Sequence, residues 1–186
     1  AHSAGCLLLA KALKENVPGV ETVVSRGWPK DAAVLDGANA LVLFCDGGIH
    51  GLLGPHVKEV DALAAKGVGI AVLHYGLCED KGERGDRLLR WIGGYYERFW
   101  SVNPSWGADF QEFPKHAVTR GVRPFTIHDE WYYHMRFVEG MRGVTPVLSA
   151  VPPESTRRKS KGLAEGAAER GRIAETPSET DRGDRD

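Results

Sequence analysis

Histidine and carboxylate side chains gather at a short turn, CDGGIH, that follows the apolar run ALVLF. Asp46 ends the run, Gly47 and Gly48 allow a sharp change of chain direction, and His50 follows them. Imidazole and carboxylate groups are ligands of zinc and other divalent ions, and backbone amides in such a turn can bind a small molecule. We therefore treat all four as candidate ligand-binding residues, and His50 also as a candidate metal ligand. The alternative is an ordinary strand-to-helix turn in which Asp46 only caps the next segment.

A second turn, HYG, follows the apolar run GIAVL and contains His74 and Tyr75. In α/β enzymes a residue on such a turn is pushed into the cleft, where histidine can act as an acid, a base or a metal ligand. His74 is thus a candidate catalytic residue and metal ligand, and Tyr75 a candidate ligand-binding residue. The alternative is a histidine that only hydrogen-bonds within its turn. A cysteine nucleophile is poorly supported, because neither Cys45 nor Cys78 stands at the turn itself.

The stretch FTIHDEWYYHMRF, residues 125–137, alternates apolar and polar residues, which is typical of a strand. On a strand Glu130 and His134 lie about 13 Å apart and cannot share one metal ion. Asp129 is the only charge on the apolar face, where an unpaired carboxylate is costly. Either the strand bulges, or Asp129 meets a partner, or HDE is a loop and the strand begins at Trp131. We favour the loop, because it frees Asp129 and Glu130 to face a cleft as candidate catalytic carboxylates.

Aromatic residues are dense in the second half of the chain, where Trp100, Trp106 and Trp131 lie within an irregular, proline-containing segment. Flat aromatic rings suit the apolar faces of sugars, so Trp106 is a candidate ligand-binding residue. The alternative, that these rings are the packing of an irregular subdomain, is the favoured one.

The elements that must position these residues follow from hydrophobic periodicity. HSAGCLLLAKALKE has a helical stripe with Ser3 as its N-cap, and HVKEVDALAAKG is an amphipathic helix that Gly67 closes. GERGDRLLRWIGGY is a further short helix, and GVETVVS, ANALVLF and VGIAVLHY are strand-like runs, the last two of the kind buried on both faces. Alternating strands and helices predict an α/β fold with a mainly parallel sheet. Ligands bind such sheets beyond the carboxyl ends of the strands, where both turns stand.

Composition narrows the class of protein. The net charge is −1 and the pI about 6.7, so no basic field indicates nucleic acid as a partner. The longest apolar runs are far short of the roughly 20 residues that a membrane-spanning helix needs. Residues 151–186 are rich in charge and contain no aromatic side chain, which predicts a disordered tail after a domain at 1–150. The compartment, periplasmic, secreted or cytoplasmic, stays open because the chain does not begin with Met.

Several segments together resemble the ThuA-like (trehalose utilisation) domain family: HSAGCLLLAKAL, ALVLFCDGG, GIAVLHYG, WIGGYYERFWSVNPSW, KHAVTRGVRPFTIHDEWYYHMRF and VTPVLSAVPPE. The resemblance implies a class I glutamine amidotransferase-like, flavodoxin-related three-layer sandwich. It also implies an association with carbohydrate utilisation. Among the groups around the family's cleft, this chain retains His50, His74, Asp129 and Glu130, with Asp46 in support and a divalent metal such as zinc as the implied cofactor.

The chain departs from that family at both ends. Relatives begin with a strand and a His-rich loop, of which only Ala1 and His2 stand here, and they continue into strands with a Gly-Gly-His element where this chain has its charged tail. We therefore expect an incomplete domain whose first strand is missing. The expected function is metal-assisted chemistry on a sugar or glycoside. The alternatives are a non-catalytic sugar-binding or structural module, and a fragment without independent function, so enzymatic activity stays open.

Overall fold

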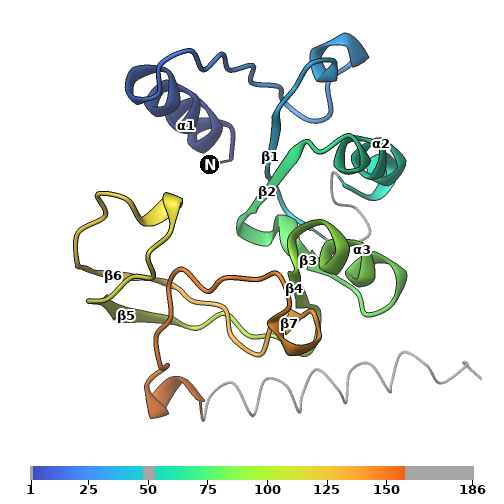
Figure 1. The fold of residues 1–186 in the computed structure, drawn as a ribbon. Coiled ribbons are helices and arrows are strands. Elements are labelled where there is room, and N and C mark those ends of the chain that lie inside the picture. The colour runs from blue at the N-terminus through green and yellow to red at the C-terminus, as the bar shows by residue number, and fades with distance from the viewer. Residues whose placement is uncertain (1, 48–52, 158–186) are drawn as a thin grey trace, which may run out of the picture. The chain divides into compact units, whose positions relative to one another are not determined.

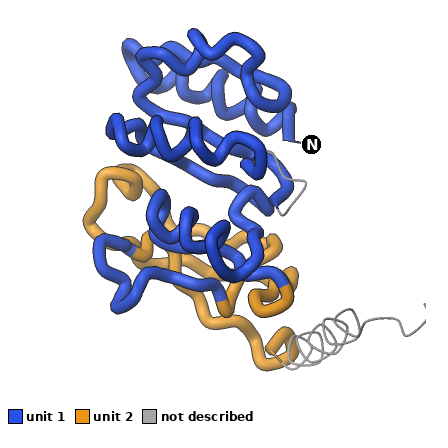
Figure 2. The backbone as a smooth tube through the Cα atoms, turned by 90° about the vertical axis from the view of Figure 1, so that its right-hand side faces the viewer, with its two compact units in different colours: residues 1–98, 135–145 blue, residues 99–134, 146–186 orange. Residues whose placement is uncertain are grey.

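The computed structural model describes residues 2–47 and 53–157 of the 186-residue chain. The chain divides into two compact units, shown in Figure 2: unit 1 comprises residues 1–98 and 135–145, and unit 2 comprises residues 99–134 and 146–186. The candidates Gly48 and His50 lie outside the described residues, as do residues 158–186 of the expected tail. None of the described helices is long and apolar enough to span a membrane.

The helices and strands follow the order of labels in Figure 1. Unit 1 contains α1 (His2–Asn16), η1 (Ala32–Leu35), β1 (Ala40–Phe44), α2 (Leu53–Ala65), β2 (Gly69–Leu73), η2 (His74–Leu77), β3 (Cys78–Glu79), α3 (Glu83–Ile92), β4 (Gly94–Glu97), β7 (Arg136–Phe137) and η4 (Glu139–Met141), where η denotes a 3-10 helix. Unit 2 contains β5 (Ser105–Phe110), η3 (Ala117–Thr119) and β6 (Phe125–Glu130).

Unit 1 is mixed α/β, as the sequence predicts, and its longest strand pair is parallel. β1 pairs with β2 over five residues each, from Ala40 opposite Gly69 to Phe44 opposite Leu73. β3 pairs with β4 in parallel, and β7 pairs with the other side of β4 in antiparallel orientation. Because β1 and β2 are parallel and in register, the residues that follow Phe44 and Leu73 leave the sheet at the same edge.

The core of unit 1 lies between these strands and the helices α2 and α3. Leu43, Val60, Leu88 and Tyr95 are buried there, with Leu53 and a ring of half-buried apolar residues around them. The predicted end of the second helix at Gly67 is confirmed, since Gly67 follows α2 with a φ of +83°, although α2 begins at Leu53 and not at the predicted His56. Gly93, for which no role was predicted, closes α3 in the left-handed region. Both conformations favour glycine because it has no β-carbon.

Three predictions for unit 1 are wrong. Ser3 lies inside α1 and does not cap it, because the described helix already includes His2. Residues 19–25, GVETVVS, form no strand. The two parallel strands are not buried on both faces, since Val42 is 38% and Leu73 39% exposed. The physical reason is that, within the described ranges, β1 and β2 pair only with each other, and burial of a parallel sheet needs neighbouring strands and covering helices.

Unit 2 is built on the antiparallel pair β5 and β6, which runs from Ser105 opposite Glu130 to Phe110 opposite Phe125. On β5 every second residue is buried: Trp106, Ala108 and Phe110. Trp131, together with Phe113 and Phe125, packs against this row and forms the second core. The alternation of one buried and one exposed face is the pattern expected of a two-stranded sheet covered on one side.

The prediction of a loop at HDE is wrong, because β6 includes His128, Asp129 and Glu130 and ends before Trp131. The loop was favoured because a strand would bury the Asp129 carboxylate without a partner. In the structure Asp129 is exposed, and its carboxylate accepts a hydrogen bond from the Glu130 backbone N–H. The aromatic residues after Trp131 form no continuous strand. Tyr133 makes only an isolated bridge, and the chain then turns at His134, whose φ is +56°.

Candidate metal centre

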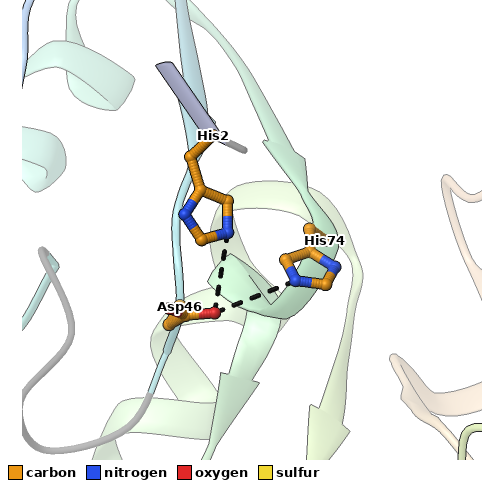
Figure 3. Close-up of side chains that lie close together, drawn as sticks. All are labelled: His2, Asp46 and His74. Atoms are coloured by element: carbon orange, nitrogen blue, oxygen red, sulfur yellow. Dashed lines mark ion pairs between the residues drawn. The ribbon is translucent and has the colours of Figure 1, made fainter. Parts of the chain in front are cut away.

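Two imidazoles and one carboxylate converge beyond the carboxyl ends of β1 and β2 (Figure 3). Asp46 Oδ1 lies 3.6 Å from His2 Nε2 and 3.8 Å from His74 Nε2. The donor atoms of all three residues lie within 4.8 Å of one another. The side chains are accessible, with exposed fractions of 35% for His2, 73% for Asp46 and 38% for His74. This is the one group of three such residues with metal-binding spacing in the part of the chain that is described.

Each member comes from a different element of unit 1. Asp46 follows β1 and His74 directly follows β2, so the parallel register carries both to one edge of the sheet. His2 comes from the first turn of α1 and reaches the same edge from the side of Phe44. The sequence placed the turns of Asp46 and His74 beyond the carboxyl ends of strands, but it proposed His50 and His74, not Asp46, as metal ligands, and His2 was not among the predicted site residues.

Three glycines let these elements approach closely. A β-carbon on Gly5 of α1 would lie 2.2 Å from the Phe44 ring, so the helix rests directly on the last residue of β1. A β-carbon on Gly47 would lie 2.2 Å from the Cys78 carbonyl oxygen. One on the buried Gly76 would lie 2.9 Å from the Val72 side chain. Since real β-carbons do not come so near, only glycine permits these approaches.

His74 adopts a backbone conformation that is unusual for a residue with a β-carbon. Its φ is +57°, in the left-handed region, at the junction between β2 and η2. Such a conformation costs on the order of 1 kcal/mol, and it is found preferentially at functional sites. At this junction the imidazole points toward Asp46 (Figure 3).

Aromatic rings support both imidazoles. The Phe44 ring meets the His2 ring edge-on at a centroid distance of 5.1 Å and the His74 ring at 5.9 Å. Tyr75, a predicted ligand-binding residue, packs its ring against His74 at 5.2 Å and against Tyr96 at 5.5 Å. Edge-to-face contacts of this kind hold ring orientation, which a metal site requires of its ligands.

Two of the three donor pairs have nearly the spacing of ligands on a divalent transition ion. Two ligands about 2.1 Å from a tetrahedral ion are about 3.4 Å apart, and the two distances to Asp46 exceed this by only a few tenths of an ångström. Imidazole nitrogens suit zinc and its neighbours in the first transition row, whereas magnesium and calcium prefer oxygen ligands. Three protein ligands leave coordination positions for water or a substrate.

The thiol near this edge is not a competing nucleophile. Burial raises the pKa of Cys78 to about 11, so the thiol is protonated at neutral pH. Thiolate is the reactive form of cysteine, and its fraction is therefore very small. For Cys78 this agrees with the sequence-based argument against a cysteine nucleophile.

The remaining candidates have other surroundings. Gly47 packs against the backbone of the turn that holds His74. Asp129, Glu130 and Trp106 belong to unit 2, so their predicted roles beside His74 stay predictions. Trp106 is only 9% exposed and lies in the second core, against which Trp131 packs, so the packing interpretation fits these two tryptophans, whereas Trp100 is 46% exposed.

Comparison of the chain with family models, with curated proteins and with solved structures gives no match.

Proposed function

We propose that this protein is a ThuA-like domain that binds one divalent transition ion through His2, Asp46 and His74 and acts on a sugar or glycoside. The observation that carries the proposal is the convergence of two imidazoles and a carboxylate at the carboxyl edge of a parallel strand pair. That edge is where α/β proteins bind their ligands. The resemblance of the sequence to ThuA-like domains supports the carbohydrate substrate and the flavodoxin-like, amidotransferase-like sandwich as the finer fold.

A bound ion of this kind polarises a substrate oxygen and lowers the pKa of a coordinated water. The protein's own residues supply the geometry for that chemistry. The single Asp46 oxygen faces both imidazoles and brings a negative charge to the centre. Phe44 and Tyr75 form aromatic walls on which an apolar sugar face can pack, since both touch the His74 ring.

The decisive experiment is metal analysis of the purified chain after dialysis against zinc, with isothermal titration of the metal-free protein. We expect about one equivalent of zinc, and loss of most of the affinity in His74→Ala and in Asp46→Asn. His56→Ala is the matched control, because His56 is a histidine of α2 that hydrogen-bonds Glu59 and lies outside the three-residue group. It should bind zinc as the wild type does.

The proposed substrate class is tested by measuring whether sugars bind to the zinc-loaded protein. Thermal unfolding with and without a panel of mono- and disaccharides should show a zinc-dependent rise in Tm for the sugar that binds. Protection by sugars without any bound metal would favour a non-catalytic sugar-binding module. Equal zinc binding by wild type and His74→Ala would refute the proposed centre, and an uncooperative melt would favour a fragment without independent function.

A further inference from the structure

Helix α1 is held loosely in unit 1. None of its 15 residues is buried, and Leu7 and Leu8 are 59% and 69% exposed. A hollow of about 390 Å³ lies along its C-terminal half, between Leu7, Lys14 and neighbouring helix residues on one side and Thr22 and Val24 on the other. Apolar burial therefore contributes less to the docking of this helix than to that of α2 and α3, which bury leucine and valine side chains, since the contribution scales with the area removed from water.

The specific contacts of α1 lie in its first turn. Among the described residues, every ion pair and ring contact between α1 and the rest of unit 1 involves His2, which meets Asp46, Phe44 and His74. Gly5 rests on the Phe44 ring one turn later. The polar pairs of the helix further along, Lys11–Glu15 and Asn16 with the Ala12 carbonyl, lie within the helix itself. One metal ligand is thus also the main polar attachment of the helix.

We propose that metal binding docks α1: the ion joins His2 to Asp46 and His74 and thereby fastens the helix to the ends of β1 and β2. This inference rests on the proposed metal centre. In the metal-free protein α1 undocks readily, and an isolated helix of about 15 residues is marginal in water. The docked helix supplies three ligands, whereas the undocked one leaves only Asp46 and His74 for the ion. Metal therefore favours the docked state through its higher affinity for it.

Reciprocity makes the inference quantitative. The factor by which metal raises the docking constant of α1 equals the factor by which docking raises metal affinity. Removal of the His2 imidazole leaves the two ligands that the undocked state offers, so the loss of zinc affinity in His2→Ala gives a lower bound for this factor. Couplings of this kind are usually about 5- to 150-fold.

Hydrogen exchange of the full chain, measured peptide by peptide with zinc or with a chelator, tests the coupling. In the wild type, zinc should slow exchange in residues 2–16 by at least the factor that His2→Ala costs in zinc affinity. In His2→Ala, zinc at a saturating concentration should leave α1 exchange unchanged apart from any change shared with α3. His2→Cys should restore part of the effect, because a thiolate is also a zinc ligand.

The outcomes separate this inference from the metal centre itself. If zinc binds the wild type through Asp46 and His74 but α1 exchanges at the same rate with and without it, the docking inference is overturned and the centre stands. If zinc slows α1 equally in wild type and His2→Ala, the helix responds to global stability and the inference is again overturned. If titration shows no zinc binding, the proposed centre fails, and the docking inference with it.

Discussion

Gly47 lies so close to Tyr75 that a β-carbon on the glycine would stand 2.4 Å from the Tyr75 carbonyl oxygen. This close approach joins the loop after β1 to the turn after β2. Asp46 directly precedes Gly47 and His74 directly precedes Tyr75, so the contact also sets the distance between Asp46 and His74. The same β-carbon would also meet the Cys78 carbonyl oxygen, so the contact is with backbone that cannot rotate away.

Gly47→Ala should therefore separate the two turns. We expect a loss of about 1–3 kcal/mol in the free energy of unfolding, the usual range for overpacking, and at least a tenfold loss of zinc affinity. Gly107→Ala is the matched control, because nothing lies within 4 Å of a β-carbon at that strand position. Chemical denaturation and zinc titration measure both effects. Unchanged zinc affinity in Gly47→Ala would show that this contact does not position the site.

His74→Gly should separate the stability of the fold from its function. Glycine adopts the left-handed conformation without a β-carbon clash, so we expect the metal-free protein to gain about 1 kcal/mol while zinc affinity falls sharply. His134→Gly is the control, because His134 has the same backbone conformation, with a φ of +56°, but belongs to unit 2. It should stabilise the protein to a similar extent and bind zinc normally. A His74→Gly variant less stable than His74→Ala, which loses the same ring contacts, would contradict the assignment of backbone strain to this residue.

The sequence predicted those elements whose signals are local. The amphipathic pattern before Gly67 predicts most of α2, although the helix begins three residues earlier, at Leu53, and a short helix was also predicted where α3 lies. The strand predicted at residues 19–25 is absent, because a strand needs a hydrogen-bonded neighbour and β-branched residues alone do not supply one. At HDE the error came from assigning a burial cost to Asp129, whose exposure only the three-dimensional arrangement reveals.

The candidate site was predicted to a similar depth. Asp46 and His74 could be paired because both follow apolar runs that became parallel neighbours. His2 stands at the start of a helix, and nothing in its local sequence indicates that this end meets the edge of the sheet. The signal that could have found it is Gly5, a poor helix former inside an apolar stripe, which often marks close packing of a helix.

The ion pair between Arg136 and Glu97 should stabilise the attachment of β7 to β4. Arg136 donates to Glu97 from both Nε, at 2.6 Å, and Nη2, at 3.3 Å, and Glu97 is buried with only 8% exposure. Arg136→Ala leaves that carboxylate without its guanidinium, so we expect a loss of about 2 kcal/mol in denaturant unfolding, less than for a fully buried pair because Arg136 is partly exposed.

Arg142→Ala is the matched control for this prediction. Arg142 pairs with Glu139 at 3.5 Å, but both side chains are more than 80% exposed. An exposed pair of this kind contributes little, so its removal should cost no more than about 0.5 kcal/mol. In the double variant Arg136→Ala with Glu97→Gln, part of the lost stability should return, because the buried charge is gone. Equal effects of Arg136→Ala and Arg142→Ala would contradict the role given to burial.

Glu79 should make the stability of the protein depend on pH in a direction opposite to that of most carboxylates. The residue is 4% exposed, and burial raises its pKa above the ordinary value of 4.5, although Arg84 Nη1 lies 3.6 Å from its carboxylate. Since the folded state then binds the proton more tightly, the stabilising contribution of Glu79 is fully present below the unfolded pKa. It is lost as pH rises through the higher folded pKa.

The difference in unfolding free energy between wild type and Glu79→Gln, measured by denaturation from pH 4 to 8, should therefore fall as pH rises from about 4.5. At neutral pH the variant should be at least as stable as the wild type, because glutamine buries no charge and the partly exposed Arg84 can turn to solvent. For Asp109→Asn the difference in unfolding free energy from the wild type should change with pH in the opposite direction, because hydrogen bonds from Thr126 and Gln111 lower the pKa of Asp109. The contribution of that residue is present above the ordinary value of 3.8 and is lost as pH falls. A difference for Glu79→Gln that stays constant with pH would show that this carboxyl group titrates alike in the folded and unfolded chains.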